Sequence, residues 1–113
     1  KNSENNKVFK TIMAYLYQLL EAAQKEYEDS VFWYIERSST AAENFIIAIN
    51  HTLQLICTNP KRWQNKYKNF YELGVEKYPF NVIYTIDDLN QIVTVIAIYH
   101  HKRNPRKKYK RKK

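Results

Sequence analysis

The side chains best suited to chemistry lie at the end of the chain. His100 and His101 are adjacent, and histidine changes its protonation near neutral pH, so either residue could donate or accept a proton. Three cations and an aromatic ring follow, which could hold a phosphate and stack on a base: Lys102, Arg103, Arg106 and Tyr109. Proton-transfer groups beside cations are what cleavage of an RNA phosphodiester requires.

The two histidines follow a strongly apolar stretch, residues 91–99, which predicts a β-strand. Successive side chains of a strand point to opposite faces of its sheet. We therefore expect His100 and His101 to face opposite sides, so that only one of them can serve a given site. The other would be structural or would contact a protein partner.

The basic charge of the protein is concentrated in the same segment. The formal net charge is +8, and nine of the twelve residues from Lys102 to Lys113 are Lys or Arg, so residues 1–101 together carry −1. Such a block binds polyanions, because cations that neutralise phosphates release condensed counterions. A solvated tail is the alternative, since blocks of like charge often have no other role. Pro105 restricts the backbone there, which favours a binding role for residues 100–106.

A second basic segment, residues 61–68, interleaves four cations with two aromatic rings. This pattern suits the binding of a single-stranded nucleic acid. The candidate contacts are Lys61, Arg62, Trp63, Lys66 and Lys68. Trp63 could instead bury itself over the sheet edge, and Trp33 is expected in the core between helix and sheet, because large aromatic side chains dominate core burial.

The composition excludes several kinds of site. Gly74 is the only glycine, which rules out the glycine-rich loops that cradle phosphates and dinucleotides. Cys57 is the only cysteine, so there is no disulfide framework and no cysteine-based zinc site, and the three histidines lack metal-binding spacing. We expect no cofactor and no metal. No segment is long and apolar enough to span a bilayer, and we expect a soluble, cytoplasmic protein.

Two helices are predicted in the first half of the chain. The first has apolar residues at helical spacing: Ala23, Tyr27, Val31, Tyr34 and Ile35. Thr40 followed by Glu43 has the spacing of a capping box, so the second helix is predicted to begin there. Its apolar stripe comprises Ala42, Phe45, Ile46, Ile49, Leu53 and Ile56. Proline disfavours helical backbone in the residue before it, so Asn59-Pro60 ends this helix, and the pair forms an antiparallel hairpin.

The second half of the chain changes to the pattern of strands. Residues 61–69 are expected to form a loop, and residues 71–75, 80–86 and 91–99 to form strands. Short turns such as residues 87–90 join antiparallel neighbours. The apolar face of this sheet needs a cover, and the helical hairpin can supply it. The predicted fold class is therefore α+β, with a helical hairpin packed on one face of a small antiparallel β-sheet.

Three groups of residues, in this order along the chain, resemble the RelE/ParE toxin superfamily. The first group lies in the predicted helices and comprises Glu26 to Asp29, Trp33, Tyr34, Ala42, Phe45 and Leu55 to Pro60. The second is the strand motif from Tyr78 to Tyr84, which is similar to the family's Pro-Tyr-x-Ile-x-Tyr. The third runs from Ile96 to Pro105 and ends in His-x-x-Arg-x-Pro.

This resemblance implies the layout of the chain. The family opens with an edge strand, so residues 13–20, which also fit a helix, are expected to form a strand. Residues 1–12 would be a flexible leader upstream of a natural start near Met13. Residues 13–105 would form a single toxin-like domain, and residues 106–113 a basic C-terminal tail. The first helix lacks the Ser or Pro that often caps it in this family, since Glu21-Ala22 stands there.

The resemblance also implies a function, the toxin of a type II toxin–antitoxin pair with a cognate antitoxin protein as partner. Members of the ParE branch bind DNA gyrase, whereas members of the RelE branch cleave messenger RNA in the ribosome. A RelE-like activity would make His100, His101, Arg103 and Tyr109 the catalytic residues. Many RNA-cleaving members carry an arginine about where Asn81 falls, which favours the ParE-like reading. A nucleic-acid-binding module without toxicity is a further alternative.

Overall fold

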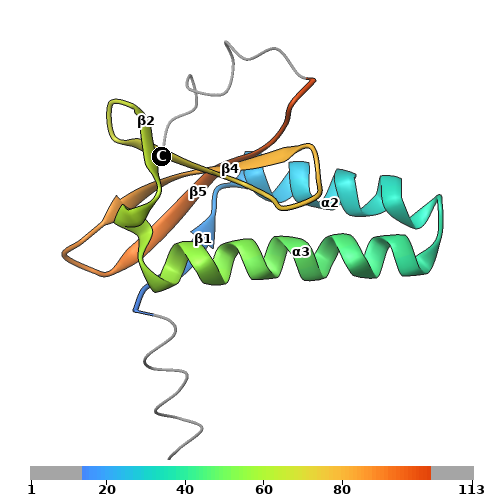
Figure 1. The fold of residues 1–113 in the computed structure, drawn as a ribbon, viewed down its shortest axis with the longest axis horizontal. Coiled ribbons are helices and arrows are strands. Elements are labelled where there is room, and N and C mark those ends of the chain that lie inside the picture. Colours follow the sequence, from blue (N-terminus) through green and yellow to red (C-terminus); the bar gives the residue numbers. More distant parts are fainter. Residues whose placement is uncertain (1–13, 103–113) are drawn as a thin grey trace, which may run out of the picture.

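Two helices form an antiparallel hairpin on one side of a sheet (Figure 1). The structure, a computed structural model, describes residues 14–102. In chain order the elements are β1 (Leu16–Leu19), α2 (Glu21–Ile35), α3 (Ser39–Thr58), a 3-10 turn η1 (Pro60–Arg62), β2 (Gln64–Tyr67), β3 (Phe70–Gly74), β4 (Phe80–Asp87) and β5 (Ile92–His100). No helix in residues 14–102 is both long and apolar enough to cross a membrane.

The predicted fold class is confirmed, and the sheet is mixed. Its five strands lie in the order β1-β5-β4-β3-β2. β5, β4 and β3 pair antiparallel as expected, and β2 adds a further antiparallel pairing with β3. β1 pairs with β5 in parallel, with Leu16 opposite Ile92 and Leu19 opposite Val95. Paired residues of these two strands are 76 positions apart in sequence, and they are brought together because the helical hairpin carries the chain over one face of the sheet. The edge strand expected within residues 13–20 is therefore present.

The ends of α3 test the predicted capping. The helix begins at Ser39, and its N-cap is Ser38, whose Oγ accepts a hydrogen bond from the Ala41 N–H at 2.9 Å. The capping box predicted at Thr40 and Glu43 is wrong, because Ser38 already supplies the oxygen that the first turn needs. The helix ends at Thr58, before Asn59-Pro60, as predicted.

The helix-side core is built around aromatic rings. Phe45 of α3 is fully buried, and its ring centroid lies 4.7 Å from that of Tyr34 and 5.2 Å from that of Phe80. The remaining buried residues of this core include Ile49, Leu53, Ile56, Val82, Tyr84, Val93, Val95 and Ile98. Aromatic pairs at these separations contribute stabilisation beyond that of the apolar area that they bury. This cluster therefore holds the hairpin against β4 and β5.

A β-bulge sets which side chains of β5 face the helices. Ile83 of β4 lies opposite Ala97, but Tyr84 lies opposite Val95, so Ile96 is an extra residue in β5. A bulge of this kind resets the alternation of side chains along the strand. Beyond it, a second cluster forms on the sheet face opposite the helices, comprising Ile83, Ile96, Ala97 and Tyr99 with Leu20 and Phe70 against them. We call this face the second face.

Residues 61–69 contain a strand where the sequence predicted only a loop. β2 is short, polar and fully exposed, and it pairs with β3 across a turn in which Lys68 has a φ of 52°. Its residues carry no apolar alternation, so pairing with β3 alone makes them a strand. Residues 1–12 and 106–113, predicted to be a leader and a tail, lie outside the described residues.

Candidate functional site

His100 and His101 face opposite sides of the sheet, as the alternation of the strand predicted. The half-buried His100 ring lies on the helix side, edge to face with Phe80 at 4.9 Å between centroids. His101 is exposed, and its Nε2 lies 2.9 Å from Oδ1 of Asn81, whose side chain is on the second face. The two imidazoles therefore do not converge on one reacting group.

His101 is held by a network that crosses three neighbouring strands. Asn81 of β4 donates a hydrogen bond through Nδ2 to the carboxylate of Glu72 on β3, which is buried. Its Oδ1 faces the His101 imidazole at the end of β5. We call these three residues the Glu72–Asn81–His101 network.

The network assigns the proton on His101. A carboxylate only accepts hydrogen bonds, so the Asn81 amide must turn its Nδ2 to Glu72 and its Oδ1 to His101. The oxygen then accepts from Nε2–H, which leaves Nδ1 of a neutral His101 as the proton acceptor. The arrangement orients the imidazole, but the amide carries no proton from the histidine to the carboxylate.

The only glycine of the chain leaves room for this network. Gly74 lies opposite Asn81 in the β3–β4 pairing, and a Cβ built on Gly74 would be 3.2 Å from Asn81 Oδ1. That separation is tighter than an ordinary carbon–oxygen contact, so a side chain at this position would press on the amide. The absence of a side chain at Gly74 therefore leaves space for the Asn81 amide.

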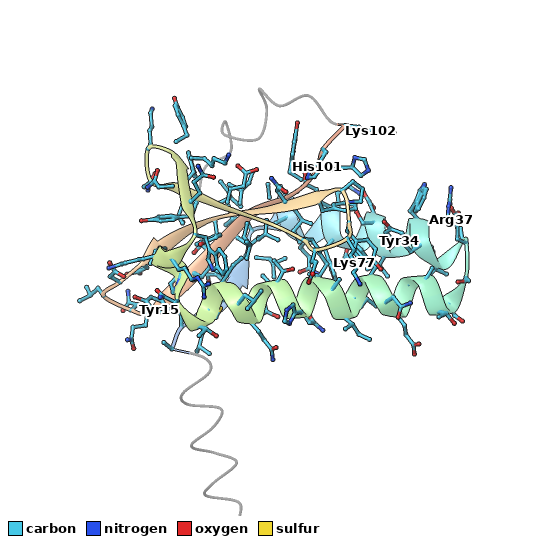
Figure 2. All side chains as sticks on the ribbon, viewed as in Figure 1. Tyr15, Tyr34, Arg37, Lys77, His101 and Lys102 are labelled. Carbon is cyan, nitrogen blue, oxygen red and sulfur yellow. The ribbon has the colours of Figure 1, made fainter. Side chains whose placement is uncertain are left out.

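One backbone hydrogen bond ties the residue after β5 to the residue before β4, and a second hydrogen bond lies within the end of β5. The His101 N–H donates to the Pro79 carbonyl at 2.9 Å, and the Lys102 N–H donates to Nδ1 of His100 at 3.1 Å. Lys102 is exposed beside His101 (Figure 2). The other predicted residues of this end, Arg103, Arg106 and Tyr109, lie outside the described residues.

Lys61 lies at the other end of the sheet. Its Nζ is 2.8 Å from Asp88 Oδ2, and the Tyr15 hydroxyl donates to Oδ1 of the same carboxylate at 2.7 Å. Tyr15 and His101 are far apart in the molecule (Figure 2). The hydrogen bonds from Lys61 and Tyr15 hold the pKa of the Asp88 carboxyl below its usual value. Asp88, in the β4–β5 turn, therefore holds both Lys61 of η1 and Tyr15, which precedes β1, and Lys61 is not brought near His101.

Trp63 packs against the protein, which agrees with the second of its two predicted placements, burial rather than exposure for binding. It is half-buried against the helix-side core, and its indole N–H donates to the Leu55 carbonyl at 3.4 Å. The guanidinium of Arg62 lies over its ring, 4.8 Å from the centroid. The Trp63 ring is therefore already in contact with the Arg62 guanidinium. A role for Arg62 and Trp63 in binding stays a prediction.

The β2–β3 hairpin carries the remaining predicted cations. Lys66 and Lys68 are exposed, and the Lys68 ammonium lies 5.2 Å from the ring centroid of Tyr67. Tyr67 in turn stacks on Phe70, with 6.3 Å between centroids. Cations beside stacked aromatic rings therefore occur at the tip of this hairpin, which projects from the sheet (Figure 1).

Trp33 is not in the core, so that prediction is wrong. It is 50% exposed and lines a cavity of about 400 Å³ between α2 and the adjacent ends of β4 and β5. The inward stripe of α2 runs through Ala23, Tyr27, Ser30 and Tyr34 at steps of three and four residues. Trp33 falls one position off this stripe, and the spacing could have placed it at the surface.

The sequence drew attention to Asn81 only as a missing arginine, and it did not anticipate the contact with Glu72 and His101. The available signal was the shared face of Glu72, Gly74 and Asn81, which depends on the strand register. Among residues 14–102, no group of three or more His, Cys, Asp or Glu side chains is placed to hold a metal ion.

Comparison with known proteins identifies the family. Residues 17–105 match the family model of the ParE toxin of the type II toxin–antitoxin system, parDE. The chain belongs to the ParE toxin family. Membership implies an antitoxin protein as the partner of this ParE-family toxin.

Two solved structures share the fold of this ParE-family chain. The chromosomal ParDE toxin–antitoxin system of P. aeruginosa gives a TM-score of 0.64 at 10% identity, covering 76% of this chain and 95% of that chain. The isolated E. coli RelE toxin gives a TM-score of 0.54 at 19% identity, covering 80% and 88%. At these identities the likeness shows the fold alone. No curated protein matches the sequence.

Proposed function

We propose that this ParE-family toxin inhibits growth by binding DNA gyrase, and that it does not cleave RNA. The observation that carries the proposal is the state of Asn81. Where many RNA-cleaving relatives are expected to carry an arginine, the amide is bonded to Glu72 and His101 and has no charge to offer a phosphate. RNA cleavage would also need a second proton-transfer group beside His101. His100 faces the other side of the sheet, so it does not supply that group.

The proposed contacts with the target are the cations near the end of β5 and on the β2–β3 hairpin. Lys102, Lys66 and Lys68 are exposed in the structure, and Arg103 and Arg106 follow in the sequence. Gyrase acts on DNA, so cations beside aromatic rings suit a complex in which the toxin approaches both protein and phosphates.

The antitoxin is proposed to lay a helix or strand along the toxin and to cover the basic end with acidic residues. Because gyrase and antitoxin would both have to be reached, the proposed compartment is the cytoplasm. Co-expression with the antitoxin should relieve the growth arrest that the toxin alone causes. A toxin that causes no arrest would contradict this part of the proposal.

A supercoiling assay tests the target. Purified toxin added to gyrase and relaxed plasmid should block supercoiling or accumulate cleaved DNA, and Lys102→Ala should weaken the effect. Lys25→Ala is the matched control, because Lys25 is an exposed lysine on α2, away from the proposed contact. Normal supercoiling at toxin concentrations well above those of gyrase would refute gyrase as the target.

The Glu72–Asn81–His101 network favours one second candidate, RelE-like cleavage of messenger RNA in the ribosome. Nδ1 of the oriented His101 could accept the proton of a 2′-hydroxyl, with the cations of residues 102–106 at the phosphate. Mapping transcript ends after induction tests it. New cuts in register with codons that disappear in His101→Gln would establish this candidate in place of the gyrase proposal. Growth without arrest, together with salt-sensitive nucleic-acid binding, would favour a binding module instead.

A further inference from the structure

A cavity of about 400 Å³ opens beside the C-terminal half of α2. Four rings form its walls, Trp33 and Tyr34 from α2, Phe80 from β4 and His100 from β5, and Asp29 and Ser30 complete it on the α2 side. This volume lies within the range of pockets that hold ligands or partner side chains. Neither the proposed contact with gyrase nor the Glu72–Asn81–His101 network uses this cavity.

The walls of the cavity are held in place before anything binds. The Tyr34 ring stacks on the buried Phe45 at 4.7 Å, so the core fixes its position. The Arg37 guanidinium lies 3.3 Å from the ring centroid of Trp33, and its Nη1 donates to the Trp33 carbonyl at 3.1 Å. Figure 2 shows Tyr34 and Arg37 together at this end of α2. A preformed cavity lowers the entropy cost of binding.

Trp33 extends from the cavity to the protein surface. It is 50% exposed, although a side chain with so large an apolar surface usually buries most of it. Tryptophan, tyrosine and arginine are also the residues that most often dominate the binding energy of protein interfaces.

The charge around the cavity selects among partners. Asp29 is the only acid among the described residues that line the cavity. Its ion pair with Lys25 is long, 3.6 Å, with both side chains more than half exposed. Such a pair contributes little and can be exchanged for another cation. The exposed charged residues of α2 are three acids and one base: Glu21, Glu28, Asp29 and Lys25. Arg37 follows α2, but its guanidinium already contacts the Trp33 ring and carbonyl and lies 3.8 Å from Glu36. Within the cavity lining, Asp29 therefore favours a partner with a positive charge.

We propose that this cavity is a docking site for a protein partner, and that it takes a peptide segment with a bulky apolar side chain next to a lysine or arginine. The apolar side chain enters between Trp33, Tyr34 and Phe80. The neighbouring cation replaces Lys25 at Asp29. The site is on the helix side of the sheet, so it is separate from His101 and from the proposed target contact.

Capped dipeptides test the proposal on the full-length chain by NMR. Ac-Leu-Arg-NH2 should shift the indole N–H signal of Trp33 at millimolar concentration and leave that of Trp63, the only other tryptophan, in place. Ac-Leu-Glu-NH2 should bind up to about fivefold more weakly, the range of an exposed ion pair. Ac-Gly-Arg-NH2 should bind most weakly, because it has no apolar anchor.

Matched variants separate the cavity from the helix surface. Asp29→Asn should remove the preference for arginine over glutamate, while Glu28→Gln, on the same helix but outside the lining, should keep it. Trp33→Ala removes the indole signal, so its binding is followed at the backbone amide of Ser30 in the same lining, and it should weaken the Leu-Arg peptide about tenfold. Phe32→Ala should not, although Phe32 is the more exposed ring.

Three results would overturn the proposal, and none depends on gyrase. They are the absence of any shift at Trp33 in the wild-type protein, equal affinity for the arginine and glutamate peptides, and shifts at Trp33 on raising the protein concentration without peptide. The last result would mean that Trp33 contacts a second copy of this protein. The first needs no variant, so it holds even if Trp33→Ala fails to fold.

Discussion

Replacing Glu26 tests how α2 holds the end of β5, the strand that leads to both histidines. β1 ends at Leu19 opposite Val95, so within residues 14–102 no strand pairs with the outer side of β5 beyond that point. Glu26 takes the place of the missing strand, and its Oε1 accepts the Ile98 N–H at 2.9 Å. The side chain is only 7% exposed, which makes it a buried carboxylate bonded to a buried backbone donor.

The expected magnitude follows from the cost of leaving that donor unpaired. Glu26→Met keeps most of the volume but removes the acceptor, and a buried unsatisfied N–H costs about 1–3 kcal/mol. Glu26→Gln keeps an oxygen and loses only the charge, so it should cost about 1 kcal/mol or less. With an m-value of about 2 kcal/mol/M, Met should lower the urea midpoint by about 1 M.

Urea unfolding followed by circular dichroism measures the stability, and amide exchange measures the bond itself. The Ile98 amide should exchange faster in Glu26→Met than in Glu26→Gln. Glu28→Met on the exposed side of α2 is the control and should stay within about 0.5 kcal/mol of wild type. If Glu26→Met were as stable as wild type, or Glu26→Gln as unstable as Glu26→Met, the reasoning would be refuted. The first outcome would mean that burial of the carboxylate costs as much as its bond contributes, and the second that the bond needs the acidic group itself.

Three further outcomes are expected. Tyr84→Phe should cost about 1–2 kcal/mol in urea unfolding, because the buried Tyr84 hydroxyl donates to the Pro60 carbonyl at 2.6 Å; a neutral result would mean that this carbonyl finds another donor. Burial raises the pKa of the Cys57 thiol to about 11, so thiol reagents at pH 8 should react far more slowly with native than with urea-unfolded protein, and equal rates would contradict its burial. The hydrogen bond from Lys61 lowers the folded-state pKa of Asp88, so its stabilisation is present above the pKa of the unfolded carboxyl and is lost on acidification. Asp88→Asn should therefore lower the melting temperature at pH 7, with the difference from wild type shrinking as the pH falls below about 4; a difference that persists in acid would point to another cause.

The elements that sequence reasoning predicted well have local causes. Phe45, Ile49 and Ile56 recur at helical spacing, and all three are buried on the inward side of α3. The strand predicted at residues 80–86 is β4, Phe80–Asp87, whose β-branched and aromatic residues favour a strand before any partner is known. Asn59-Pro60 ended the helix for a reason confined to one peptide unit.

The elements that it missed depend on pairing and on the path of the backbone rather than on residue types. β2 has no strand pattern of its own and exists through its pairing with β3. The N-cap of α3 was predicted at Thr40 and is Ser38 in the structure. Three successive hydroxyl residues offer equivalent oxygens, and only the path of the backbone selects one of them. Trp33 was expected inside because it is large, although the helical stripe excludes it from the core.

The same distinction between local and tertiary causes holds for the candidate site. The sequence alone located the basic end, the pair of histidines, their opposite orientation and the resemblance to the RelE/ParE superfamily, because each follows from residue types or from the alternation of a single strand. Tertiary structure decided which histidine faces which side, since the bulge at Ile96 resets the alternation of β5. It also placed His101 against Asn81 and Glu72, and it gathered Trp33, Phe80 and His100 around one cavity. Those contacts depend on the register between neighbouring strands and on packing against the helical hairpin, and residue types alone specify neither.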